Sequence, residues 1–200
     1  MNKEETYLPQ GTILKNRYEV ISVIGTGGFG ITYRAVDQLL DCYVAIKEFF
    51  PKKWASRENG KSRRVAFYQD DESKKIVEEC LHNFRHEAKI LEKIKDVPYI
   101  ARLKDYFPEN ETEYIVLSLV QGETLSDYVK KRSGKLPAAE ALSYIQYTFD
   151  TLKYLHGMGI IHRDISPGNL MISEDQVLYL IDFGSATSFD GKEEFQSEQV

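Results

Sequence analysis

Three side chains that could transfer a proton and bind a metal ion lie within a short stretch of the sequence. Asp164 and Asn169 are followed, after two apolar runs at residues 170–172 and 177–181, by Asp182. Two such runs joined by a polar turn are typical of a β-hairpin, which can bring residues on its two sides to one point. A carboxylate can act as a general base, and carboxylate and amide oxygens are ligands of Mg²⁺. We therefore expect one base and two Mg²⁺ ligands to converge here.

A glycine-rich turn near the other end of the chain could bind phosphate. Residues 25–30 (Gly-Thr-Gly-Gly-Phe-Gly) follow the alternating run Tyr18–Ile24. The same glycine spacing also begins the helix of dinucleotide-binding folds. Here the following residues, 31–36, are β-branched and aromatic, which favours a strand over a helix. The pattern therefore predicts a β-hairpin whose backbone amides can lie over phosphates.

A lysine and a glutamate form the third candidate group. Lys47 lies among apolar residues in a predicted strand, 43–48, and Glu87 lies on the apolar stripe of a helix predicted from Ser73 to Ile94. A charged group on such a stripe needs a partner, because an unpaired buried charge is costly. Lys47 is the natural partner, with Glu78 and Glu79 as competing candidates for the pairing.

These motifs, in this order, resemble those of the protein kinases. The resemblance covers His162-Arg163-Asp164 through Asn169, Asp182-Phe183-Gly184, Val44-Ala45-Ile46-Lys47 and the glycine turn. Residues 84–91 also resemble the corresponding helix of bacterial protein Ser/Thr kinases. The implied fold is α+β with two lobes: a small lobe with a five-stranded antiparallel sheet and one helix, and a large lobe that is helical and incomplete.

The resemblance also implies a domain organisation. Residues 1–17 are expected to be a leader that is loose over residues 1–10, residues 18–120 the small lobe with an insertion at about 52–71, and residues 121–200 part of the large lobe. That part would contain the hinge, the helices, the catalytic loop and the start of the activation segment. The other predicted elements are strands at 100–107 and 113–120, a helix from Thr124 to about Gly134, and a helix from Pro137 to His156.

For kinases, the implied reaction is transfer of the γ-phosphoryl group of Mg-ATP to a hydroxyl of a protein substrate. By resemblance, Asp164 is the base, Asn169 and Asp182 hold Mg²⁺, and Lys47, fixed by Glu87, contacts the phosphates. The nucleotide would be bound by the following residues: Ile24, Gly25, Thr26, Gly27, Gly28, Phe29, Gly30, Thr32, Ala45, Leu117, Ser118, Val120 and Met171.

Two features of the catalytic stretch bear on activity. Ser166 occupies the position where protein Ser/Thr kinases usually carry a lysine that contacts the γ-phosphate. Arg163 resembles the kinase arginine that meets a phosphate on the activation segment, which makes Ser185, Thr187 and Ser188 candidate phosphorylation sites.

Two alternatives to a protein kinase stay open: a nucleotide-binding pseudokinase or scaffold, and a small-molecule kinase of the aminoglycoside or choline type. The choice between Ser/Thr and Tyr as acceptor also stays open.

Composition limits the other classes of function. The net charge is −5 and the basic residues are spread along the chain, which argues against nucleic-acid binding. No apolar run approaches the roughly 18 residues of a membrane span, and no apolar segment follows Met1 as in a signal peptide, so we expect a cytoplasmic protein. The two cysteines are expected to be small hydrophobic residues in a reducing compartment.

The chain ends 16 residues after Gly184. The rest of the kinase large lobe has no counterpart in it, so we expect either a fragment of a longer kinase or a chain that needs a partner. An apolar stripe on the helix at 137–156 would then be exposed to solvent.

Overall fold

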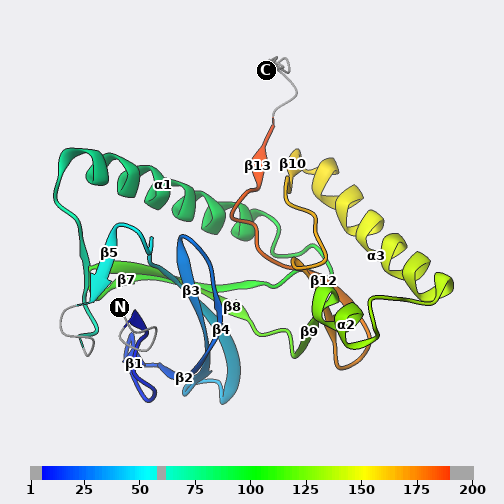
Figure 1. The fold of residues 1–200 in the computed structure, drawn as a ribbon, viewed down its shortest axis with the longest axis horizontal. Coiled ribbons are helices and arrows are strands. Elements are labelled where there is room, and N and C mark those ends of the chain that lie inside the picture. Colours follow the sequence, from blue (N-terminus) through cyan, green and yellow to red (C-terminus); the bar gives the residue numbers. More distant parts are fainter. Residues whose placement is uncertain (1–5, 58–61, 190–200) are drawn as a thin grey trace. The chain divides into compact units, whose positions relative to one another are not determined.

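The structure is a computed structural model that describes residues 6–57 and 62–189. The chain divides into two compact units, the first comprising residues 1–88 and 102–119 and the second residues 89–101 and 120–200. Each unit has its own β-sheet (Figure 1).

The first unit is built on a curled antiparallel sheet. Its strand order is β1-β2-β3-β4-β8-β7, and every neighbouring pair is antiparallel. Its strands are β1 (Ile13–Leu14), β2 (Tyr18–Thr26), β3 (Gly30–Asp37), β4 (Cys42–Phe49), β7 (Leu103–Glu109) and β8 (Thr112–Ser118). The expected five strands are present, and β1 adds a sixth, two residues long. Large side chains from neighbouring strands, including Tyr18, Tyr33, Ile46 and Val116, are buried together in one core.

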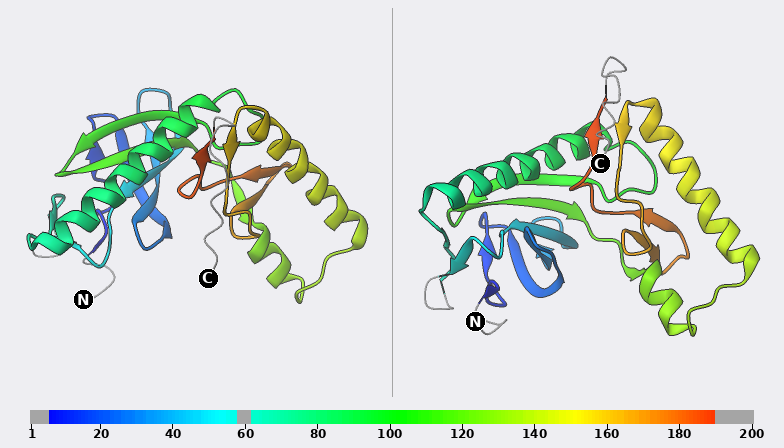
Figure 2. Two further views of the ribbon diagram at one scale, coloured as in Figure 1. Left: turned by 90° about the horizontal axis from the view of Figure 1, so that it is seen from above. Right: turned by 45° about the horizontal axis from the view of Figure 1, so that its top comes forward.

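Helix α1 (Asp71–Lys93) begins where its sequence provides a cap and negative charge. The Asp70 carboxylate accepts a hydrogen bond from the Ser73 N–H at 2.9 Å, and the first turn carries two more acids, which the helix dipole favours. The helix runs beside β7 and β8 in each view (Figure 2). Phe84 of the helix packs on Phe49 with ring centroids 5.5 Å apart.

The polar segment at 52–71, expected to be an insertion over the lobe, contains a short hairpin. Strands β5 (Ala55–Arg57) and β6 (Val65–Phe67) pair antiparallel, and residues 58–61 lie outside the described part. Arg57 is buried, although arginine is seldom buried without a charged partner.

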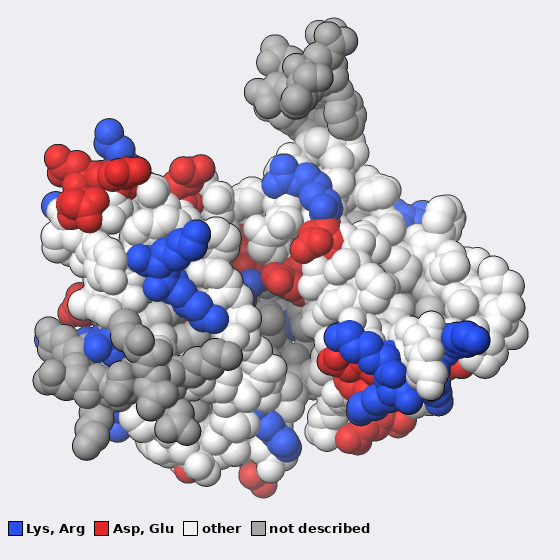
Figure 3. Space-filling view, in the orientation of Figure 1, with Lys and Arg blue, Asp and Glu red and all other residues white. Residues whose placement is uncertain are grey.

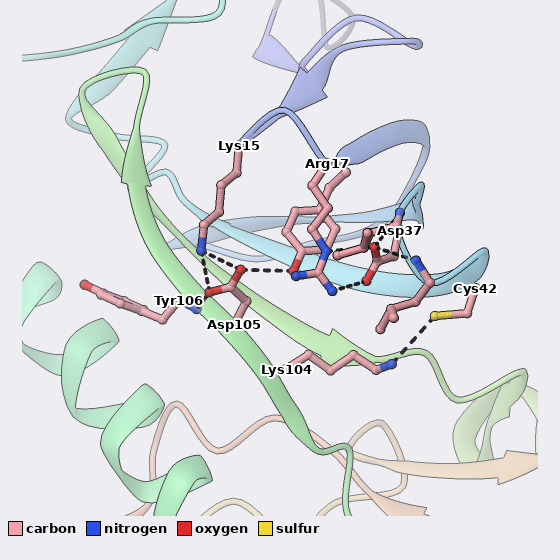
Figure 4. A network of polar contacts seen from close by, with 10 residues as sticks. Lys15, Arg17, Asp37, Cys42, Lys104, Asp105 and Tyr106 are labelled. Carbon is pink, nitrogen blue, oxygen red and sulfur yellow. Dashed lines mark hydrogen bonds and ion pairs between the residues drawn. The ribbon is translucent and has the colours of Figure 1, made fainter.

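The prediction of a loose leader is wrong for the described residues of that segment. Leu8 and Leu14 are buried in the core of the first unit. Lys15 donates to both carboxylate oxygens of Asp105 at 2.9 and 2.7 Å, and Arg17 pairs with Asp37 (Figure 4). The segment is polar in composition, but a few apolar residues and these ion pairs suffice to hold it against the sheet.

The second unit combines short strands with two helices. Strands β9 (Gly122–Thr124), β11 (Leu170–Ser173) and β12 (Leu178–Leu180) form one sheet in the order β12-β11-β9, and β10 (Ile160–Ile161) pairs with β13 (Thr187–Ser188). The helices are α2 (Leu125–Lys131) and α3 (Ala138–Gly157). As its sequence predicts, Thr124 caps α2 by accepting from the Asp127 N–H at 3.1 Å.

One predicted strand begins later than expected. Residues 100–107 were expected to form one strand, but β7 begins at Leu103, and Ile100 forms a separate parallel bridge with Leu180 in the second unit. The chain therefore leaves the second unit for the first between these two positions.

The outward face of α3 is apolar. Leu142, Ile145 and Phe149 are 65%, 64% and 63% exposed, whereas Leu155, on the same predicted stripe, is fully buried. The expected exposed stripe is thus present over the first part of the helix. Elsewhere, acidic and basic side chains lie in mixed groups on the face drawn in Figure 3. Among residues 6–57 and 62–189, no helix has both the length and the apolarity of a membrane span.

Candidate functional site

The glycine turn joins two strands, as expected, and does not begin a helix. Gly25 pairs with Thr32 and Thr26 with Ile31, which leaves residues 27–29 at the tip. The turn is closed by the Gly27 N–H, which donates to the Gly30 carbonyl at 2.9 Å. A Cβ on Gly30 would lie 2.8 Å from the Glu48 carbonyl oxygen, so the close approach of strands β3 and β4 requires glycine there. This strand–turn–strand arrangement excludes the dinucleotide-binding alternative.

Lys47 and Glu87 form an ion pair within the first unit. The Lys47 Nζ lies 2.8 Å from each carboxylate oxygen of Glu87, although 40 positions separate the residues in sequence. The Glu87 side chain is 4% exposed and that of Lys47 is 21% exposed. The carboxylate can therefore fix an ammonium group that still reaches solvent.

A second contact fixes the same helix two residues earlier. Arg85 of α1 donates through both Nε and Nη2 to the carboxylate of Glu113, which stands on β8. Tyr106 of β7 also donates its hydroxyl to Glu113, and burial raises the pKa of this phenol to about 12, so it remains a neutral donor at pH 7. The fork of Arg85 is a geometry that holds direction as well as distance. These contacts hold α1 against the two strands close to Glu87.

The expected adenine-binding residues of the first unit lie on neighbouring strands. Ala45 of β4 and Leu117 of β8 are direct cross-strand partners, and Ile24 lies where β2 bulges beside the glycine turn. Ser118 is occupied within its own unit: its N–H donates to the Arg102 carbonyl at 2.8 Å, and its hydroxyl accepts from the Arg102 N–H at 2.9 Å.

In the second unit, Asp164 and Asn169 are brought together. The Asn169 Nδ2 donates to the Asp164 Oδ2 and to the Asp164 carbonyl, both at 2.9 Å. Its backbone is held too, because the Ile181 N–H donates to the Asn169 carbonyl at 2.9 Å. With the amide nitrogen engaged twice, the amide oxygen is the atom of Asn169 that can face a cation.

The segment around Asp164 contains a buried histidine that packs on the phenylalanine next to Asp182. His162 is 1% exposed, and its ring packs edge-on against Phe183 with centroids 4.8 Å apart. Burial lowers the pKa of His162, so the ring is neutral at pH 7 and its Nδ1 can accept from the Asp164 N–H at 3.3 Å. The residues just before Asp164 and just after Asp182 are thereby held together.

Asp182 and Arg163 both have left-handed backbone conformations, with φ of 60° and 63°. The Gly184 N–H donates to Asp182 Oδ1 at 3.2 Å, and the Nε of Arg163 donates to the Ser185 carbonyl at 2.6 Å. Non-glycine residues adopt this conformation mainly where surrounding structure imposes it, often in functional segments.

The donor set suits a cation that arrives with phosphate. Asn169 and Asp182 offer an amide and a carboxylate oxygen, which Mg²⁺ accepts, and Mg²⁺ commonly completes its shell with water and substrate phosphates. Within the two described ranges, no group of three His, Cys, Asp or Glu side chains could hold a metal by itself. Asn169 and Asp182 are therefore the residues that could hold such an ion together with phosphate oxygens.

The predicted site residues are divided between the units. The first unit holds residues 24–30, Thr32, Ala45, Lys47, Glu87, Leu117 and Ser118, and the second holds Val120, Asp164, Asn169, Met171 and Asp182. Within each unit, the structure joins one polar pair: Lys47 with Glu87, and Asp164 with Asn169.

Sequence reasoning missed the residues that support these pairs. Arg85, Tyr106 and Glu113 had no motif to mark them, and the one available signal was the charge of Glu113 at the start of an apolar strand. The burial of Glu48 was missed in the same way, because this residue was noted only as the last position of the predicted strand 43–48.

Comparison with known proteins agrees with the motif order. The protein kinase domain family model matches residues 18–200. The serine/threonine-protein kinase PknA of Mycobacterium tuberculosis is 32% identical over 195 residues, which are 95% of this chain and 40% of that protein. The serine/threonine-protein kinase PrkC of Bacillus subtilis is 32% identical over 178 residues, 89% of this chain and 24% of that protein. The chain thus spans less than half the length of these relatives.

A solved structure described as "PpkA-294 apo form" is similar to this chain with a TM-score of 0.82 and 32% identity, over 90% of this chain and 62% of that one. The curled antiparallel sheet of the first unit and the three helices of the described part are consistent with a kinase-like fold. The match over residues 18–200 shows that this chain belongs to the protein kinase domain family, with bacterial serine/threonine-protein kinases among its relatives.

Proposed function

We propose that this chain carries the nucleotide-binding and catalytic residues of a protein Ser/Thr kinase that transfers the γ-phosphoryl group of Mg-ATP to a protein hydroxyl. The observation that carries the proposal is the Asp164–Asn169 pair, in which a potential base is held at 2.9 Å by an amide whose oxygen can face a cation. In this proposal residues 18–120 form the nucleotide-binding lobe, and residues 121–200 belong to the lobe that binds the protein substrate.

The first unit would bind the triphosphate. The ammonium of Lys47, fixed by Glu87, would neutralise phosphate charge, and the backbone N–H groups of residues 28–30 would donate to phosphate oxygens, since the Gly27 N–H is engaged within the turn. Ala45, Leu117, Ile24 and Met171 would pack on the adenine, and Thr32 would pack beside it. The Ser118 carbonyl and the Val120 amide are the backbone groups proposed for its polar edge, since the Ser118 N–H is already engaged.

The second unit would carry out the transfer. Asp164 would orient the acceptor hydroxyl and take its proton as the oxygen attacks the γ-phosphorus and the bond to the β–γ bridging oxygen breaks, releasing ADP. Asn169 and Asp182 would hold Mg²⁺, which supplies positive charge to the phosphates when it is bound. Neutral His162, packed on Phe183, would keep the backbone of Asp164 in place.

The test is transfer of labelled γ-phosphate from Mg-ATP to the chain itself and to a generic protein substrate, with Asp164→Asn as the matched control. We expect transfer by the native chain, little by the variant, and label on serine and threonine after hydrolysis. Equal transfer by both proteins would overturn the assignment of Asp164. Label on tyrosine alone would overturn the proposed acceptor, and labelling of aminoglycoside or choline instead of protein would favour the small-molecule kinase.

Ser166 supports a second candidate, a nucleotide-binding module without catalysis. The lysine that usually contacts the γ-phosphate is absent at this position. Saturable binding of Mg-ATP by a native chain that transfers no phosphate would favour this candidate. Because the proposed reaction consumes ATP, we also propose that the protein works in the cytoplasm.

A further inference from the structure

A buried carboxylate lies next to the lysine of the proposed phosphate site. Glu48 is completely buried and accepts hydrogen bonds from the hydroxyls of Tyr33 and Tyr114, each at 2.8 Å. These tyrosines stand on β3 and β8, the strands on either side of β4. Burial and the nearby carboxylate raise the pKa of both phenols, so both are neutral donors. Among the residues that the structure describes, the cation that pairs with Glu48 is Arg57.

Arg57 connects three separate stretches of the first unit. Its Nη2 donates to Glu48, its Nε donates to the carbonyl of Thr6 at 2.8 Å, and its Nη1 donates to the carbonyl of Arg63 at 2.5 Å. The guanidinium also lies over the ring of Phe50, 5.3 Å from its centroid. Neither side chain of the Arg57–Glu48 pair is exposed to solvent. The β5–β6 hairpin is therefore attached to the end of β4 by a buried ion pair.

The segment between Glu48 and Arg57 also holds the tip of the glycine turn. The Phe50 N–H donates to the Phe29 carbonyl at 3.0 Å, and the Lys52 N–H donates to the Gly28 carbonyl at 3.1 Å. This segment is fixed at one end by Glu48 and at the other by Arg57. Loss of the buried pair would leave Glu48 in the sheet but would remove the restraint at the Arg57 end of the segment to which the turn is bonded.

We propose that Arg57 is a positioning residue that orders the glycine turn before nucleotide binds and thereby raises the affinity for nucleotide phosphates. The inference rests on the proposed function of that turn. Glycine-rich segments lose much conformational entropy when they become ordered, and ordering them in advance removes that cost from binding. Arginine suits the role because its planar group stays charged when buried and can bind three acceptors at once, which an ammonium does with poorer geometry.

The test combines nucleotide titration with hydrogen exchange of the Gly27 and Phe50 amides, which donate to carbonyls of the turn, in the nucleotide-free protein. The variants are Arg57→Lys, Arg57→Met and the pair Arg57→Met with Glu48→Gln, which leaves no unpaired buried charge. In these variants we expect the Gly27 and Phe50 amides to exchange faster. We also expect Mg-ATP to bind roughly tenfold more weakly, because binding would then include the entropic cost of ordering about one backbone residue. Arg64→Met, an exposed arginine of the same hairpin, is the matched control and should behave as the native chain.

Another variant tests the connection without touching the buried pair. Residues 51–54 form a β-turn in which the Trp54 N–H donates a hydrogen bond to the Pro51 carbonyl. Lys52 is the second residue of this turn, and proline is favoured at the second position of such turns. Lys52→Pro removes the N–H that bonds to Gly28 together with an exposed ammonium, and Lys52→Met, which removes the ammonium alone, is its control. Relative to Lys52→Met, Lys52→Pro should weaken nucleotide binding and speed exchange in the turn. This variant decides the question if the Arg57 variants do not fold.

The outcomes separate this inference from the proposed function. Native affinity and native exchange in folded Arg57 variants and in Lys52→Pro would overturn the role of Arg57. Failure of the native chain to bind Mg-ATP would overturn the proposed function, while the exchange of the Gly27 and Phe50 amides would still report whether Arg57 orders the turn. A lower melting temperature with unchanged exchange would reduce Arg57 to a purely structural role and also overturn the inference.

Discussion

The Nζ of Lys47 lies 2.8 Å from both carboxylate oxygens of Glu87, across 40 positions of sequence. One oxygen would suffice for charge balance, and the double contact also sets the direction of the ammonium. Lys47→Met should therefore lower kcat for phosphoryl transfer by about 10²- to 10³-fold, the usual cost of removing one preorganised donor. Steady-state kinetics with Mg-ATP would measure this loss.

Glu87→Gln should lower the same rate less, because Lys47 keeps its charge and loses only its orientation. Glu79→Gln, an exposed change on the same helix, is the control and should leave the rate unaltered. A Glu79 variant as impaired as the Glu87 variant would contradict the assignment of the pair.

The contact between Arg85 and Glu113 should contribute measurably to stability. The Arg85 side chain is 53% exposed and that of Glu113 is 10% exposed, so solvent screens the pair in part. A double-mutant cycle of Arg85→Ala and Glu113→Gln, followed by denaturant unfolding, should give a coupling free energy of about 0.5–1 kcal/mol. Strictly additive effects would show that the forked contact is not maintained in solution.

Asp37 should make the stability depend on pH in acid. Arg17 donates to both of its carboxylate oxygens, at 2.8 and 2.7 Å, and this pairing holds the pKa of Asp37 below its ordinary value of 3.8. The native state then binds this proton less readily than the unfolded state, so the stabilisation is complete above about pH 4 and is lost as the pH falls further. Asp37→Asn should cost about 1–3 kcal/mol at pH 7.

Denaturant unfolding between pH 3 and pH 7 would check the sign of the Asp37 effect. Plotted against pH, the free energies of unfolding of the native chain and of Asp37→Asn should converge in acid. Protonation of Asp37 removes the ion pair with Arg17 from the native chain, and the substitution has already removed it from the variant. Curves that stay parallel over this range would rule out Asp37 as the source.

Gly122 should not tolerate a side chain. A Cβ there would lie 1.9 Å from the Ile172 carbonyl oxygen, so β9 and β11 would have to separate. Gly122→Ala should destabilise the chain by about 1–3 kcal/mol, as overpacking of a close contact does. Gly157→Ala is the matched control: nothing lies within 4 Å of the added methyl, and alanine favours the helix, so thermal unfolding should be unchanged or slightly later.

Much of the first unit could be predicted because its motifs combine residue type with spacing. The strand character of residues 31–36 was enough to predict a hairpin instead of a helix start. The apolar stripe made Glu87 a candidate partner of Lys47, and the resemblance of residues 84–91 to the kinase helix favoured it over Glu78 and Glu79. In both cases the local pattern and the tertiary contact point to the same answer.

The missed features depend on contacts that no local pattern encodes. Arg57 lies in a polar, charged segment, which usually indicates solvent exposure, and its burial depends on a carboxylate nine positions earlier. Leu8 is one apolar residue in a polar segment, so periodicity could not indicate that it is buried. The beginning of β7 was misjudged because Ile100 continues the apolar run although it bonds within the other unit.

The Arg57 side chain offers a natural spectroscopic label. Its Nε–H is buried and hydrogen-bonded to a backbone carbonyl, whereas exposed arginines exchange that proton quickly with water. In an ¹⁵N-edited NMR spectrum it should give a sharp, slowly exchanging guanidinium resonance that stands apart from the others. Because its acceptor is the Thr6 carbonyl, this one signal would report in real time whether the first described residues of the chain are attached to the sheet.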